Sequence, residues 1–146
     1  MNGLRNNHGI YVDKQGNAYH GMWKLGIIHG KGILRAPAST YNGSFVNSLK
    51  HGSGEERFAY GDSYKGEYQN NRFDGFGSYS WKENGANYEG SFKNGMRHGK
   101  GKWSAGETKY SGGYVEGLKE GYGELYFPSG NFYKGNFIED KREGYG

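Results

Sequence analysis

The stretch Tyr19–Gly32, YHGMWKLGIIHGKG, contains a spacing of tyrosine, glycine and aromatic residues that recurs along the chain. In it a glycine follows the tyrosine by two residues, an aromatic ring follows by four, and a second pair of glycines ends the unit. Five further units begin at Tyr41, Tyr64, Tyr88, Tyr110 and Tyr133, with successive starts 22, 23, 24, 22 and 23 residues apart. A fixed period of this length is the signature of a repeat protein, so the sequence predicts six units and a partial one over residues 1–18.

Positions 1, 3 and 5 of each unit fall on one face of a β-strand, because side chains alternate between the two faces. Position 5 is always a ring: Trp23, Phe45, Tyr68, Phe92, Tyr114 or Phe137. A glycine opposite a ring on the neighbouring strand leaves room for that ring to lie flat over the backbone. The pattern therefore predicts a core of rings over glycines on a single sheet. Glu56 interrupts the apolar pattern, and we expect it near an edge of that face.

The connections favour hairpins. Within each unit the two strands are separated by a short segment that ends in Gly, Asn, Ser or Asp, and Asn94–Gly95 is the strongest of these turn signals. The link 36–40 contains neither Gly nor Asn, so we expect a local irregularity there. The predicted fold is all-β: an elongated, twisted, single-layer array of about 13 antiparallel strands, forming one domain over residues 1–146.

Composition excludes several other classes of protein. Of 146 residues 29 are glycine and 17% are aromatic, while only 33% are hydrophobic, which argues against an aliphatic helical core. No run approaches the ~20 apolar residues that a membrane-spanning helix needs. The chain has no cysteine, so it can form no disulfide and supply no thiolate. A cytoplasmic protein is the simplest interpretation.

The spacing of the histidine and acidic residues does not support a catalytic site or a metal site. His29 and His51 occupy equivalent positions two strands apart, which places them ~9.5 Å from each other, too far to share one zinc ion. The neighbouring acids Glu55 and Glu56 point to opposite faces of a strand and cannot act as a pair. We therefore expect no enzyme activity, no metal and no cofactor.

The motif Tyr-x-Gly-x-Trp-x-x-Gly-x-x-His-Gly-x-Gly, complete in Tyr19–Gly32 and nearly so in Tyr88–Gly101, resembles the MORN (membrane occupation and recognition nexus) repeat. The resemblance covers roughly residues 8–146. It implies a groove-shaped β-sheet assembly that serves as a docking platform, as in ciliary and radial-spoke proteins, cytoskeletal scaffolds and membrane junctions. The chain departs from the motif at Ser48, Asn71 and Asp140, which replace the turn glycine.

A non-catalytic scaffold in a cilium or the cytoskeleton is thus the expected function. It would bind a helix or an extended peptide of a partner protein in an aromatic-lined groove. Large rings are favoured contact residues because they bury area at low entropic cost. The candidate partner-binding residues are Trp23, Phe45, Tyr68, Tyr79, Trp81, Phe92, Trp103 and Tyr114.

Charge suggests an alternative. The net charge of +4 is concentrated in the first third of the chain, where the candidate lipid-binding residues are Lys24, Lys31, Arg35 and Lys50. Such a region could contact anionic phospholipids at a membrane surface. Nucleic acid is disfavoured, because acids in most later repeats interrupt a continuous phosphate track. The chain begins and ends within a repeat, so we expect an excerpt of a longer array, able to self-associate through its terminal repeats.

Overall fold

The computed structural model describes residues 7–142, and every regular element in that range is a β-strand. The chain divides into two compact units, residues 1–72 and 73–146. The expected features of the two ends, including the final glycine pair, lie largely outside the described residues. A single array over residues 1–146 stays a prediction.

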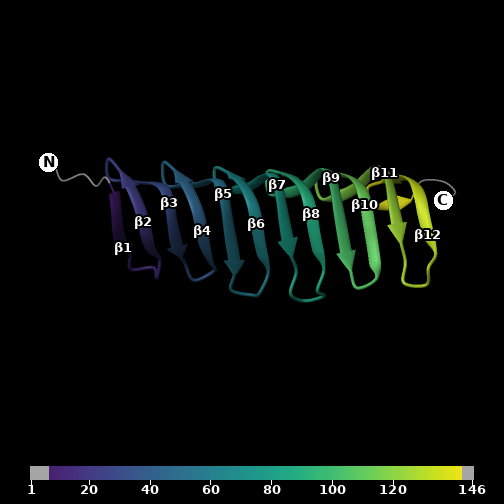
Figure 1. Cartoon of the computed structure of the whole chain (residues 1–146), viewed down its shortest axis with the longest axis horizontal. Coiled ribbons are helices and arrows are strands. Elements are labelled where there is room, and N and C mark those ends of the chain that lie inside the picture. Colours follow the sequence, from purple (N-terminus) through teal and green to yellow (C-terminus); the bar gives the residue numbers. More distant parts are fainter. Residues whose placement is uncertain (1–6, 143–146) are drawn as a thin grey trace. The chain divides into compact units, whose positions relative to one another are not determined.

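The first unit contains the strands β1 (Asn7–Val12), β2 (Ala18–Lys24), β3 (Ile27–Arg35), β4 (Ser39–Val46), β5 (Leu49–Phe58) and β6 (Ser63–Gln69). Each of these strands pairs in antiparallel fashion with the next one in the chain. The repeat therefore folds as a hairpin, and successive hairpins are added side by side (Figure 1).

The second unit repeats this arrangement. Its strands are β7 (Arg72–Ser80), β8 (Asn87–Lys93), β9 (Met96–Ala105), β10 (Thr108–Val115), β11 (Leu118–Tyr126), β12 (Phe132–Ile138) and β13 (Lys141–Arg142). Neighbours in the chain again pair antiparallel. The predicted class, all-β with consecutive antiparallel hairpins in an open sheet, is confirmed for the described residues.

The hairpin turns within the repeats have two central residues, and both have positive φ. The pairs are Leu25–Gly26, Asn47–Ser48, Asn70–Asn71, Asn94–Gly95, Glu116–Gly117 and Glu139–Asp140. This is the type I′ geometry, whose twist matches that of the flanking strands. The sequence indicated such turns through their last residue, which is always Gly, Asn, Ser or Asp. The link 36–40 is a tight loop, closed by hydrogen bonds of 2.8 and 3.3 Å between the backbones of Ala36 and Ser39.

The position 1 tyrosines form the centre of the core and lie flat on glycine. Tyr88 is fully buried, and a Cβ added to Gly90 or Gly101 on the two paired strands would collide with its ring or hydroxyl. The same holds for Tyr19, Tyr41 and Tyr110 over their own glycine pairs. Rings therefore pack on bare backbone as predicted, but glycine lies opposite glycine, as Gly90 does opposite Gly101, and the ring comes from the tyrosine two residues earlier in the strand.

The hydroxyl of each of these tyrosines closes a β-bulge. The register of β8 with β9 shifts between Gly90 and Phe92, so the carbonyl of Ser91 leaves the ladder. Tyr88 donates its hydroxyl to that carbonyl at 2.9 Å. The hydrogen bond from the tyrosine at position 1 to the carbonyl at position 4 recurs in all six repeats that begin with a tyrosine, at 2.8–2.9 Å. One side chain thus fills the space above two glycines and satisfies the carbonyl that the bulge leaves unpaired.

Candidate functional site

In each compact unit a row of side chains covers the ring face close to the hairpin turns. The row is formed by the second residue after each type I′ turn: Ile28 and Lys50 in the first unit, and Phe73, Arg97, Lys119 and Arg142 in the second. Four of the six are cations that lie over core rings, with 5.4 Å from Lys50 to Tyr41 and 5.0 Å from Arg97 to Tyr114. Sequence reasoning missed this row. A basic residue at the same position in four repeats was the signal that could have found it.

Backbone hydrogen bonds between repeats hold the row in place. In each case the second residue of a turn donates its N–H to the carbonyl of the row residue one repeat earlier. The bonds run from Ser48 to Ile28, Asn71 to Lys50, Gly95 to Phe73, Gly117 to Arg97 and Asp140 to Lys119, at 2.8–3.0 Å. Within each compact unit, consecutive turns are therefore linked to one another, and these bonds help to hold the row residues above the rings.

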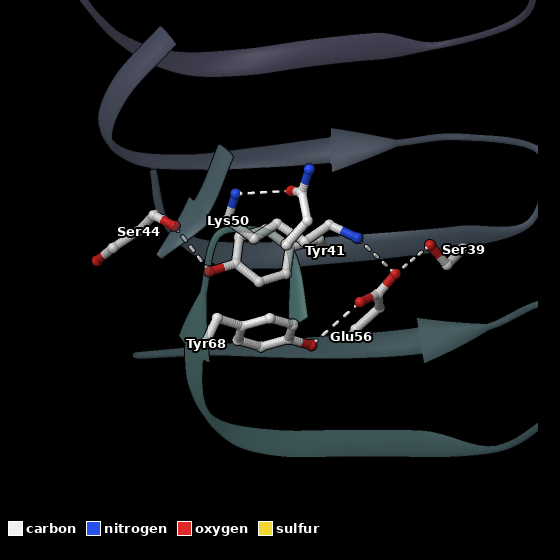
Figure 2. A network of polar contacts seen from close by, with 7 residues as sticks. Ser39, Tyr41, Ser44, Lys50, Glu56 and Tyr68 are labelled. Carbon is white, nitrogen blue, oxygen red and sulfur yellow. Dashed lines mark hydrogen bonds and ion pairs between the residues drawn. The ribbon is translucent and has the colours of Figure 1, made fainter. Parts of the chain in front are cut away.

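In the first unit this row takes part in a buried polar network (Figure 2). Glu56 is only 4% exposed and lies opposite Tyr41 and Tyr64 on the paired strands. Its carboxylate accepts hydrogen bonds from Ser39 at 2.5 Å and Tyr68 at 3.1 Å, and pairs with the Lys50 ammonium at 2.8 Å. The expectation that Glu56 lies near an edge of the face is therefore wrong: three donors compensate for its burial.

The same network corrects one candidate for lipid contact. The Lys50 side chain is 17% exposed, and its charge is neutralised by Glu56. It is not free to meet a lipid headgroup. Lys24, Lys31 and Arg35 are exposed, and Lys31 and Arg35 share the face of β3 that is opposite to the tyrosines.

In the second unit the row borders two cavities. One, of about 310 Å³, is lined by Phe73, Tyr79, Trp81, Phe92, Gly95, Met96, Arg97 and Gly117. The other, of about 300 Å³, is lined by Trp81, Asn84, Ala86, Arg97, Trp103, Tyr114, Lys119 and Asp140. Trp81 and Arg97 belong to both cavities, and the guanidinium lies 5.6 Å from the indole. We call Tyr79, Trp81, Arg97, Trp103 and Lys119 together the Trp81 surface.

The predicted partner-binding residues separate into two groups. Phe45, Tyr68, Phe92 and Tyr114 are buried, at 2–6% exposure, and make edge-to-face contacts with the core tyrosines. All four pack the sheet and are not freely exposed, but Phe92 and Tyr114 also contribute to the lining of the two cavities. Tyr79, Trp81 and Trp103 are half-buried and belong to the Trp81 surface. Trp23, also half-buried, packs in the first unit against Tyr11 and Tyr19.

The core tyrosines are neutral donors at ordinary pH. Burial raises the pKa of Tyr88 and of Tyr110 to about 12, and raises the pKa of Tyr114 further still. Burial, and after it the charge of Glu56, raise the pKa of the Tyr68 phenol far above its usual range. Such groups give hydrogen bonds and packing, whereas a general acid or base needs a pKa near the working pH.

Within residues 7–142 no three His, Cys, Asp or Glu side chains lie close enough together to hold a metal ion. The same range holds no helix with the length and apolarity to cross a membrane.

An open antiparallel sheet built from tandem hairpin repeats, with rings stacked on glycine, defines the class of this protein. The MORN repeat family matches seven consecutive segments: residues 1–18, 19–38, 41–63, 64–85, 88–105, 110–132 and 133–146. The chain therefore belongs to the MORN repeat family. This family consists of non-enzymatic repeats that generally mediate contacts with proteins or membranes.

Two groups of relatives are similar over part of the chain. Alsin from Rattus norvegicus and Homo sapiens is 33% identical over 117 residues, which is 72% of this chain and 7% of Alsin. MORN repeat-containing protein 3 from Xenopus laevis is 36% identical over 74 residues, or 46% of this chain and 31% of that protein. The chain thus spans only a small part of the length of the Alsin proteins that it matches.

Proposed function

We propose that this chain is a non-catalytic docking module that binds a partner protein, as a helix or extended peptide, over the Trp81 surface. The observation that carries the proposal is the position of Trp81 and Trp103. Both indoles are half-buried beside cavities of about 310 and 300 Å³, whereas the neighbouring rings Phe92 and Tyr114 are at least 94% buried. Tryptophan and arginine next to a pocket are the residue types that contribute most to protein–protein binding.

The surface also carries charge. Arg97 and Lys119 lie among the indoles, so a partner segment with both apolar and acidic side chains fits it best. A ciliary or cytoskeletal assembly is the setting that we propose, on the basis of the resemblance to MORN proteins of such assemblies.

A pair of variants tests the proposal. Trp81→Ala removes the ring shared by both cavities, and Tyr122→Ala removes an aromatic ring that is 52% exposed on the opposite face of the sheet. We expect co-purification from the source cells to yield a defined partner with the native chain and with Tyr122→Ala, and to lose it with Trp81→Ala. The purified partner should show the same difference in direct titration. Equal binding by both variants would contradict docking at this surface.

Contact with anionic phospholipids is the second proposal, now supported by three exposed bases, Lys24, Lys31 and Arg35. Flotation with phosphatidylserine vesicles tests it. Binding that falls with salt and is lost in the double variant Lys31→Glu and Arg35→Glu would support membrane contact, since each base contributes about 1 kcal/mol near an acidic surface. Absence of flotation by the native chain would remove the proposal.

A further inference from the structure

The two units contain equivalent sites that differ in one decisive residue. The network residues Ser39, Tyr41, Lys50, Glu56 and Tyr68 of the first unit correspond by repeat position to Ala86, Tyr88, Arg97, Trp103 and Tyr114 of the second. The pairing register agrees: Glu56 lies opposite Tyr41 and Tyr64, and Trp103 lies opposite Tyr88 and Tyr110. The second site thus keeps a cation and a phenol but has tryptophan at the position of the Glu56 carboxylate.

The phenol at the second site has no hydrogen-bond partner. Tyr114 is 2% exposed, and its hydroxyl is buried without a donor or acceptor beside it. The equivalent hydroxyl of Tyr68 donates to Glu56 at 3.1 Å. A buried hydroxyl without a partner costs about 1–3 kcal/mol, so an acceptor brought within reach of it would be stabilising.

The cation at the second site is also without a carboxylate. The Arg97 guanidinium lies 5.0 Å from the Tyr114 ring and 5.6 Å from the Trp81 ring, and it donates to the Gly117 carbonyl at 3.0 Å. No carboxylate oxygen among the described residues lies within ion-pair distance of it, whereas Lys50 holds Glu56 at 2.8 Å. The planar guanidinium of an arginine has several N–H donors, so Arg97 has further donors with which to bind an anion.

Space for such an anion exists at the same place. Trp103, at the position of Glu56, borders the cavity of about 300 Å³ together with Arg97, Tyr114 and Lys119. Asp140 also lines this cavity and opposes an anion, but one of its oxygens already accepts the backbone N–H of Lys119 at 2.7 Å. Two cations against one acid leave the cavity with a net positive charge.

We propose that this cavity binds a glutamate or aspartate side chain from an acidic peptide segment of the partner. The carboxylate accepts from the Tyr114 hydroxyl and the Arg97 guanidinium, as Glu56 does from Tyr68 and Lys50. Trp81 and Trp103 pack against the apolar side chains next to the acid. The inference rests on the proposed docking function and adds the chemistry of the recognised segment.

Titration with a pair of blocked peptides tests it directly. One is acetyl-Leu-Glu-Leu-Glu-Leu-amide, and the control carries glutamine in place of both glutamates. The indole N–H signals of Trp81 and Trp103 in nuclear magnetic resonance spectra report on the cavity, and that of Trp23 in the other unit is the internal reference. We expect saturable shifts of Trp81 and Trp103 with the glutamate peptide only. No shift, or equal shifts with the glutamine peptide or with inorganic phosphate, would overturn the inference.

Two variants separate recognition from folding. Tyr114→Phe removes only the unsatisfied hydroxyl, so the free protein should melt at the same or a higher temperature, while affinity for the glutamate peptide falls about tenfold. Trp103→Glu installs the missing carboxylate and should abolish peptide binding in a folded chain. Unchanged affinity in Tyr114→Phe would overturn the inference. Equal binding of the glutamate and glutamine peptides would leave docking at the Trp81 surface intact, so failure of the two proposals can be told apart.

Discussion

At the scale of single residues, the turns show the strictest geometric demand. Type I′ turns need positive φ at both central positions, and Asn followed by Gly meets this demand with least strain. The chain places Leu25, Glu116 and Glu139 at first positions, with φ of 52°, 48° and 48°. A non-glycine residue in this region costs of order 1–3 kcal/mol, and least for Asn, so these three positions store strain.

Replacing Glu116 by Asn should therefore stabilise the protein by about 1 kcal/mol. Glu116 is exposed, and Gly117 follows it, so the variant acquires the favoured Asn–Gly pair. Urea unfolding followed by circular dichroism measures the change. Glu107→Asn is the matched control, because that turn residue is exposed without positive φ, and its effect should stay within about 0.5 kcal/mol. A Glu116→Asn variant no more stable than the control would contradict the strain argument.

The tyrosine hydroxyl at position 1 has a separate effect on stability. Tyr88→Phe keeps the ring over Gly90 and Gly101 but leaves the bulged carbonyl of Ser91 without its donor. We expect the free energy of unfolding to fall by about 1–2 kcal/mol. Tyr122→Phe, which removes an exposed hydroxyl on the opposite face, should change it by less than about 0.5 kcal/mol. Chemical denaturation of both variants checks the difference, and equal losses would rule out the capping role.

At the scale of the elements, each hairpin uses its neighbours to complete its own packing. Tyr41 contacts Phe45 within its strand at 5.0 Å and Tyr68 of β6 at 4.9 Å, both edge to face. The polar network of Glu56 lies among these rings and links β4, β5 and β6. Other repeats place leucine, tyrosine or tryptophan at the position of Glu56, so the network is one solution among several for the same space.

Exchange of residues between repeats tests this equivalence. Glu56→Leu alone leaves Lys50 half-buried without a counter-ion and should cost about 3 kcal/mol or more. The triple variant Lys50→Ile, Glu56→Leu and Tyr68→Phe copies residue types found at the same positions of other repeats. It should recover most of that loss, since an apolar group of similar volume often replaces a buried ion pair at little cost. Thermal and urea unfolding would contradict this if the triple variant were less stable than the single one.

At the scale of the whole molecule, stability depends on tyrosines that must remain neutral. The pKa of Tyr88 and of Tyr110 is raised to about 12 by burial, above the ordinary value near 10 of the unfolded chain. A raised pKa means that this stability is fully present below pH 10 and is lost as the pH rises through the folded value.

We therefore expect cooperative alkaline unfolding between about pH 10 and 12. Tyrosinate absorbance and circular dichroism, followed together, measure it. Ionisation of the core tyrosines should coincide with loss of the β-sheet signal. Full ionisation of the tyrosines near pH 10 in a chain that keeps its strands would contradict the burial argument.

Much of this fold was predictable from local spacing. The position of Tyr88 relative to Gly90 and Gly101 predicted a ring on bare backbone, since parity in a strand is fixed by the chain itself. The candidate surface was predicted only in part. Tyr79, Trp81 and Trp103 were recognised as candidates, but the sequence could not separate them from Phe92 and Tyr114. All are rings on the same predicted face, and their exposure depends on what the neighbouring repeats place above them.

Sequence by itself determined the repeat, the strands, the hairpins and the family, because period, parity and turn chemistry act over a few residues. Tertiary structure alone decided which rings are buried and which are partly exposed, that Glu56 is buried, and that the Tyr114 hydroxyl lacks a hydrogen-bond acceptor. These outcomes depend on side chains 12 or more residues apart, such as Tyr68 and Glu56, meeting across strands. Whether a buried polar group finds a partner is settled only when neighbouring repeats pack.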